Sequence, residues 1–223
     1  MKVLRSVGML TMMAVLVVAL GTGCSAKTNT GDFVVENGVL TRYAGAEPVE
    51  AGDSPPDHIE TGIVVNIPDN LGITAIGGMA FSHRPGISAV NIPKGVVSIG
   101  EGAFENCTGL TSVTVPDTLE SIGAAAFGGC SSLTSVTIPE GVTSIGDGAF
   151  SNCSSLTSVI IPDSVTSIGS LAFSNCGSLA SATMGSGVTS IGNRAFEGTK
   201  LSSPVIINDG KMLCYVPSGM TSY

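Results

Sequence analysis

The chain has 223 residues, of which 43% are hydrophobic and only 12% are charged, and its formal net charge is −8. Nucleic-acid binding proteins need clustered Lys and Arg to displace counterions from phosphates. Here no basic residue lies between Lys94 and Arg194. The composition therefore argues against a nucleic-acid partner, while supplying enough apolar residues for a packed core.

The first residues have the pattern of an export signal. Lys2 and Arg5 form a positive start, residues 7–20 form an apolar run, and small residues follow. The run is shorter than the roughly 17–25 apolar residues that a membrane-spanning helix needs. We predict a signal peptide over residues 1–23.

The stretch Leu20-Gly21-Thr22-Gly23-Cys24 resembles a bacterial lipobox, although Gly21 stands where Leu is usual. The resemblance implies cleavage before Cys24 and lipidation of that residue, followed by a polar tether, so that residues 24–32 form the lipidated Cys and tether. The protein is then expected to be exported and lipid-anchored at the cell surface or envelope membrane of a bacterium. Plain secretion and a retained N-terminal anchor are the alternatives.

Most of the remaining chain repeats itself every 23 residues, over residues 67–204. Four apolar columns recur in register: Ile99, Ile122, Ile145, Ile168 and Ile191; Phe104, Phe127, Phe150, Phe173 and Phe196; Leu110, Leu133, Leu156 and Leu179; and Val96, Leu119, Val142, Val165 and Val188. One unit of this length cannot bury its own apolar residues, but stacked units can cover one another. The period therefore predicts a β-solenoid of about six rungs, where a rung is one 23-residue turn.

Each rung divides into recognisable pieces. The stretches 110–115 and 133–138 alternate and are β-branched, as strands are, and Pro ends each of them. Thr-Ser-Ile-Gly is a second, shorter extended piece. One column holds residues that tolerate a left-handed backbone, which predicts a tight corner: Asn106, Gly129, Asn152, Asn175 and Gly198, with His83 in the first rung.

The pattern I-P-x-x-V-x-S-I-G-x-x-A-F-x-x-C-x-x-L-x-S-V resembles the BspA-type leucine-rich repeat of bacterial and protist surface proteins, over roughly residues 65–207. The resemblance implies a curved solenoid with parallel strands on its concave face. It also implies a surface binding protein or adhesin rather than an enzyme.

Both ends of the solenoid are predicted to carry β-hairpin caps, which protect the terminal rungs of an open stack. Residues 33–66 form the N-terminal β cap, with a hairpin on Asn37-Gly38. Residues 46–62, acidic and Pro-rich, are expected to form a mobile loop within it. Residues 205–223 form either a second hairpin, on Asp209-Gly210, or the start of a further repeat.

The cysteines of the repeats, Cys107, Cys130, Cys153 and Cys176, stand one per rung. Zinc needs ligands that converge tetrahedrally, whereas stacked rungs place these thiols in a line. Disulfides between neighbours are conceivable, but parallel Cβ atoms ~4.8 Å apart exceed the usual spacing. We interpret the column as buried small side chains, and Cys214 likewise as packing.

No catalytic signature accompanies the remaining polar residues, so we expect no catalytic residue, no metal and no cofactor. His58 and His83 lack a partner motif, and no nucleophile elbow is present. Asp117, Glu140 and Asp163 each follow a Pro, where a turn role suffices; a weak calcium site is the alternative.

The outward-facing strand positions form what we call the Ser/Thr face: Ser112, Thr114, Ser135, Thr137, Ser158, Ile160, Ser181 and Thr183, with Ala89 and Asn91 as a continuation. It predicts binding or adhesion to a protein or glycan ligand by a monomer held at the membrane through its lipid. Against this, short hydroxyls can simply solvate a strand, and the face has none of the Trp, Tyr or Arg that favour binding. A structural or spacer module of the envelope without a specific ligand is the alternative, and a hydrolase is a distant third.

Overall fold

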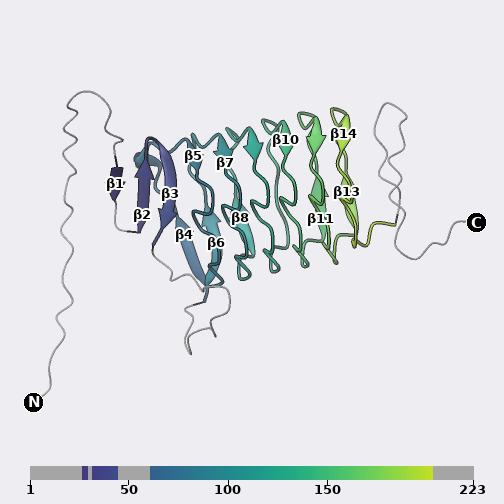
Figure 1. Ribbon diagram of the computed structural model, residues 1–223, viewed down its shortest axis with the longest axis horizontal. Helices are drawn as coiled ribbons and strands as arrows, with labels where there is room; N and C mark the ends of the chain where they lie inside the picture. The colour runs from purple at the N-terminus through teal and green to yellow at the C-terminus, as the bar shows by residue number, and fades with distance from the viewer. Residues whose placement is uncertain (1–26, 30–31, 45–60, 203–223) are drawn as a thin grey trace, which may run out of the picture.

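The computed structural model describes residues 27–29, 32–44 and 61–202. Its strands stack side by side from the N-terminal to the C-terminal end, in two rows (Figure 1). The elements are β1 (Lys27–Asn29), β2 (Phe33–Glu36), β3 (Val39–Tyr43), β4 (Ile63–Asn66), the 3-10 helix η1 (Asp69–Leu71), β5 (Ala75–Ile76), β6 (Ile87–Asn91), β7 (Ser98–Ile99), β8 (Ser112–Thr114), β9 (Ser121–Ile122), β10 (Ser144–Ile145), β11 (Ser158–Ile160), β12 (Ser167–Ile168), β13 (Ser181–Thr183) and β14 (Ser190–Ile191). The predicted β-solenoid of about six parallel rungs is confirmed.

The Ser-Ile pairs of successive rungs form one long sheet, in the order β1-β2-β3-β5-β7-β9-β10-β12-β14. Its repeat strands pair in parallel at the 23-residue offset, as in Ser98 with Ser121. The Gly after each Ile permits this close approach: a Cβ on Gly123 would lie 2.7 Å from the carbonyl carbon of Gly100 in the preceding rung. Glycine is therefore needed here for contact between rungs.

The second row of strands consists of two smaller parallel sheets, β4-β6-β8 and β11-β13. The strand predicted over residues 133–138 is absent between them, and this part of the prediction is wrong. The Thr134 N–H reaches the Thr111 carbonyl at 3.4 Å, and the Thr157 N–H reaches the Thr134 carbonyl at 3.3 Å. Both are longer than an ordinary backbone hydrogen bond, so strand pairing is weak at this rung. Exposed and buried side chains still alternate along it, as in the neighbouring strands.

The four predicted apolar columns form one continuous core. The phenylalanine rings from Phe81 to Phe196 stack face to face, with centroids 4.9–5.3 Å apart. Tyr43 lies 5.1 Å from Phe81 and continues this stack into the N-terminal hairpin. Because each ring covers the next, the core runs unbroken from the hairpin through the described rungs.

The predicted N-terminal hairpin is present as β2 and β3, which pair in antiparallel fashion. Asn37 and Gly38 at its turn both have positive φ, 52° and 77°, as a two-residue hairpin of this kind requires. The strand β3 then pairs in parallel with β5, so the hairpin extends the long sheet.

Two strands lie in segments that were predicted to be part of the N-terminal cap and of the tether. β4, assigned to the cap, pairs in parallel with β6, so the repeat ladder begins before residue 67. β1, within the expected tether, pairs with the edge of β2; backbone hydrogen bonds alone can recruit a polar segment to such an edge.

Several predictions fall outside the described residues: the signal peptide, Cys24, residues 45–60 of the acidic loop, and the C-terminal segment 205–223 with Cys214. Within the described ranges, no helix has the length and apolar character needed to cross a bilayer.

Candidate ligand-binding face

All eight residues of the Ser/Thr face are solvent-exposed. The strand register aligns Ala89 with Ser112 and Asn91 with Thr114, and further along it aligns Ser158 with Ser181 and Ile160 with Thr183. Ser135 and Thr137 lie on the unpaired stretch between these sheets and keep the same alternation. The structure therefore arranges the predicted residues in two parallel columns.

The columns extend one rung further toward the N-terminus than the sequence analysis found. Val64 aligns with Ala89, and Asn66 aligns with Asn91, whose side-chain amide donates to the Asn66 amide oxygen at 2.5 Å. Val64 is 53% exposed. The two extra residues in the first repeat hid this register, although the alternation Val64-Val65-Asn66 carried the signal.

The hydroxyl groups near this face are of two kinds. In a neighbouring column, each Thr hydroxyl donates to a backbone carbonyl of the preceding rung: Thr111 to Ser88 at 2.9 Å, and Thr134 to Thr111 at 3.4 Å. No hydroxyl of the Ser/Thr face makes such a bond to any of the residues that the structure describes. The first set holds rungs together, and the second is available to a ligand.

The Ser/Thr face is uncharged, so a ligand would meet hydrogen-bond donors and acceptors rather than a local field. Its largest apolar group is Ile160, which is 68% exposed and stands in the same column as Thr114, Thr137 and Thr183. Each rung offers little area to bury. A ligand must therefore contact several rungs to gain appreciable affinity.

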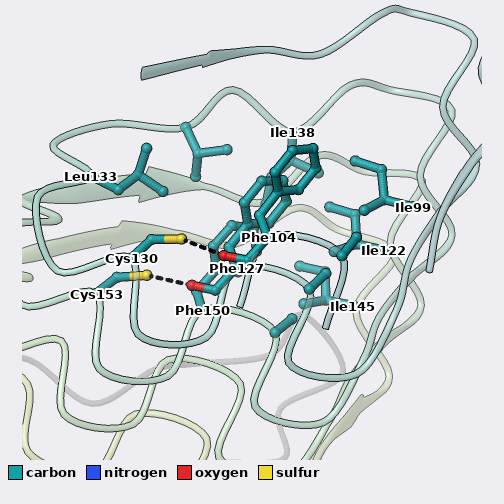
Figure 2. Packing of buried hydrophobic residues seen from close by; sticks show 14 of the residues in the cluster. Ile99, Phe104, Ile122, Phe127, Cys130, Leu133, Ile138, Ile145, Phe150 and Cys153 are labelled. Atoms are coloured by element: carbon teal, nitrogen blue, oxygen red, sulfur yellow. Dashed lines mark hydrogen bonds between the residues drawn. The ribbon is translucent and has the colours of Figure 1, made fainter. Parts of the chain in front are cut away.

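The cysteine column is buried as predicted, and all four thiols are free. Each thiol also donates a hydrogen bond, which the sequence analysis missed because the cysteines were treated as simple small side chains. The acceptors are phenylalanine carbonyls of the preceding rung, as for Cys130 with Phe104 and Cys153 with Phe127 (Figure 2). Burial raises the pKa of the Cys107 and Cys176 thiols to about 12, so these thiols stay protonated.

One acidic residue after Pro has a clear turn role. Asp163 accepts hydrogen bonds from the Ser186 N–H at 2.6 Å and the Ser186 hydroxyl at 3.0 Å, one rung later. These bonds lower the pKa of the Asp163 carboxyl below its usual value. In the part of the chain that the structure describes, no group of three or more His, Cys, Asp or Glu residues could hold a metal ion.

The left-handed corner column is confirmed, with φ between 57° and 73° from His83 to Gly198. His83 contacts the Ser82 hydroxyl through Nδ1 at 2.6 Å and the Asn106 side-chain amide through Nε2 at 3.0 Å. Asn175 makes the same kind of inter-rung contact with Asn152. His83 thus takes the structural place of an Asn in this column, and His58 lies outside the described residues.

Comparison with known proteins agrees with this geometry. The sequence model of the family described as BspA type leucine-rich repeat region matches residues 74–202 in six copies. A leucine-rich repeat protein of T. pallidum is similar in structure, with 25% identity and a TM-score of 0.57, over 80% of this chain and 88% of that one. A leucine-rich cell surface protein of Faecalibacterium prausnitzii is also similar, with 28% identity and a TM-score of 0.52. The match covers 83% of this chain and 57% of the F. prausnitzii protein. No curated protein sequence matches.

Proposed function

The chain belongs to the BspA-type leucine-rich repeat family, and from this premise we propose that it is an exported, lipid-anchored surface protein that binds an extended protein or glycan ligand. The observation that carries the proposal is the contrast between the two kinds of hydroxyl. The Thr111 column is engaged in holding rungs together, whereas the hydroxyls of the Ser/Thr face point to solvent in two columns, of which one is broken at Ile160.

The shape of the face favours an extended ligand. Strands in a sheet lie about 4.8 Å apart, so six rungs present roughly 25 Å of repeated donors and acceptors. Each contact is weak, and affinity has to come from several rungs and from many copies of the protein on one membrane. The proposal includes no catalytic step.

Two further observations support a location at the surface. The structurally similar protein from F. prausnitzii is described as a cell surface protein. The N-terminal sequence of this chain has the basic start and short apolar run of an export signal. The residues up to Cys24 resemble a lipobox, with Gly21 in place of the usual Leu.

The test is a binding screen of the full chain against host matrix proteins, cell-wall material and arrayed glycans. A face variant, Thr137→Lys with Ile160→Lys, is compared with a control variant, Thr143→Lys with Thr166→Lys, which adds the same charge at exposed positions beside the long sheet. We expect the face variant to lose binding and the control to keep it. Thr137→Lys alone should weaken binding less, because one rung supplies only part of the contact.

Equal binding by the face variant and the control would show that the Ser/Thr face is scaffold. If binding instead disappears when residues 46–62 are deleted, the acidic segment is the working site. A chain that binds nothing in the screen would favour a spacer role in the envelope.

A further inference from the structure

The four cysteines of the repeats form a chemical column that the proposed binding role does not use. Cys107, Cys130, Cys153 and Cys176 lie one per rung, 23 residues apart, and none has solvent-exposed area. An exported protein meets oxidising surroundings, in which free thiols pair readily. Their presence as free, buried thiols therefore calls for a physical account.

Each thiol connects its own rung to the rung before it. The four sulfur-to-oxygen distances to the preceding phenylalanine carbonyls are 3.0, 3.1, 3.2 and 3.1 Å. Figure 2 shows two of these bonds running in the same direction from neighbouring rungs. In the closed stack, this bond and the surrounding core hold each thiol against the preceding rung.

The closed stack keeps the thiols unreactive in two ways. A thiolate is the reactive form, and burial disfavours it by raising the pKa of all four groups. The side chains also point in parallel at the rung spacing of about 4.8 Å, which is wider than the usual Cβ separation in a disulfide. Local opening of a rung exposes its thiol to solvent, which removes the first obstacle. It also frees the neighbouring side chains to turn toward each other, which removes the second.

We infer that neighbouring cysteines of this column are latent disulfide partners, which close when adjacent rungs part in the presence of a small-molecule disulfide. One exposed thiolate attacks that disulfide, forming a mixed disulfide and releasing one small thiol. The neighbouring protein thiolate then attacks the protein sulfur of the mixed disulfide, which forms the inter-rung bond and releases the second small thiol. Two protein thiols are oxidised and one small disulfide is reduced.

The geometry restricts this pairing to neighbours. Where the stack around the opened rung keeps its native spacing, backbones one rung apart fall within the usual 4.4–6.8 Å range of Cα separations in disulfides, whereas backbones two rungs apart, at ~10 Å, fall outside it. The new bond replaces two thiol-to-carbonyl bonds, one from each cysteine, and turns the side chains from their packed positions. A stack that has opened in this way is trapped, while one that stays closed remains reduced.

The test uses the full chain in urea below the unfolding midpoint, with glutathione disulfide as the oxidant. Cys107→Ala with Cys176→Ala leaves the neighbours Cys130 and Cys153. Cys130→Ala with Cys176→Ala leaves Cys107 and Cys153, two rungs apart. Both variants lose two buried sulfurs, and matched urea midpoints establish that they are comparably folded; Cys107→Ala with Cys130→Ala offers a second neighbouring pair.

Peptide mapping without reductant gives the rate at which each pair forms, and peptides with Cys24 and Cys214 are assigned separately. We expect neighbours to pair at least about tenfold faster, since the alternate pair is out of disulfide reach in a native-like stack. A difference of about threefold or less is what loop closure in an unfolded chain gives, and it would overturn the inference. Glutathione adducts without inter-rung bonds would also overturn it. Because this test needs neither ligand nor membrane, its outcome is independent of the binding screen.

Discussion

The Arg84 guanidinium donates a hydrogen bond to the backbone carbonyl of Tyr43 and lies 5.5 Å from the centre of the Tyr43 ring. Arg84 occupies the first-rung position of the cysteine column, and Tyr43 occupies the preceding position of the phenylalanine column. The hairpin is therefore joined to the first rung by the same kind of bond that joins later rungs. Here the donor is charged, which makes the bond stronger.

Replacing Arg84 with Leu should destabilise the N-terminal end of the solenoid. Arg84 is only 5% exposed, and the change removes a charged hydrogen bond and a cation–π contact. We expect a loss of about 2–4 kcal/mol in the free energy of unfolding. Urea denaturation measures it, with the exposed Arg42→Leu as the control, and a difference between the two below about 0.5 kcal/mol would contradict this role.

Removing a ring from the phenylalanine stack should lower the free energy of unfolding far more than shortening a side chain of the Ser/Thr face. Phe150 is fully buried between Phe127 and Phe173, so Phe150→Ala should lower the free energy of unfolding by roughly 3–5 kcal/mol. Ile160 points to solvent, and Ile160→Ala should change it by less than about 0.5 kcal/mol. Thermal and urea melts of the two variants give the comparison. Similar costs would mean that Ile160 is packed against something in the folded chain.

The contribution of Asp163 to stability should depend on pH. Hydrogen bonds from Ser186 favour the charged carboxylate, so the pKa of Asp163 is lower in the folded chain than in the unfolded one. Its stabilising effect is complete above the unfolded pKa of roughly 4 and is lost as the pH falls through the lower folded pKa. Asp163→Asn should therefore lower Tm at pH 7, and the difference from wild type should shrink below about pH 4. Ser186→Ala should reduce the effect, and a difference that does not change with pH would count against it.

The proposed lipidation at Cys24 predicts a specific behaviour on extraction. The expressed protein should partition into detergent, and its N-terminal peptide should carry the mass of acyl chains. Cys24→Ala should move the protein to the aqueous phase. The control variant Cys214→Ala, which keeps Cys24, should stay in the detergent phase. A Cys24→Ala protein that remains equally membrane-bound would show that another segment anchors it.

Much of the fold could be predicted because identical demands recur at a fixed interval. The Ile, Phe and Leu columns must each cover their own copies, so burial could be inferred at Phe127 or Leu133 from periodicity alone. The corner at Asn106 and Asn152 was predictable because few residue types tolerate its backbone. The exposed Ser/Thr face followed from strand alternation, once the inward positions were known.

Other features carry no such signal. A second left-handed column has φ between 50° and 61°, and it holds Met79, Gly102, Ala125, Gly148, Leu171 and Arg194. Because the residue types in this column are so varied, they do not indicate its left-handed backbone. Inter-rung hydrogen bonds must hold that conformation, as does the bond from the Leu171 N–H to the Asn193 carbonyl at 2.9 Å. The break in strand pairing near Ser135 depends on small shifts between rungs, which a repeat that reads almost identically does not encode.

The inter-rung side-chain bonds described above share a direction that bears on how the chain assembles. The Thr, Cys and Arg84 donors all sit on the later rung, and the acceptors, as at Thr111, Phe104 and Tyr43, sit on the earlier one. Asp163 likewise accepts a hydrogen bond from an N–H of the following rung. The bond from the Gly95 N–H to the Thr118 hydroxyl runs the other way, from the earlier rung to the later one. Protein synthesis proceeds from the N-terminus, so most side-chain donors of a newly made rung find their acceptors on a rung that has already been made. These side-chain bonds can therefore form in the order of translation, whereas the corner backbone bonds, such as that from the Leu171 N–H to the Asn193 carbonyl, close only when the next rung has been made.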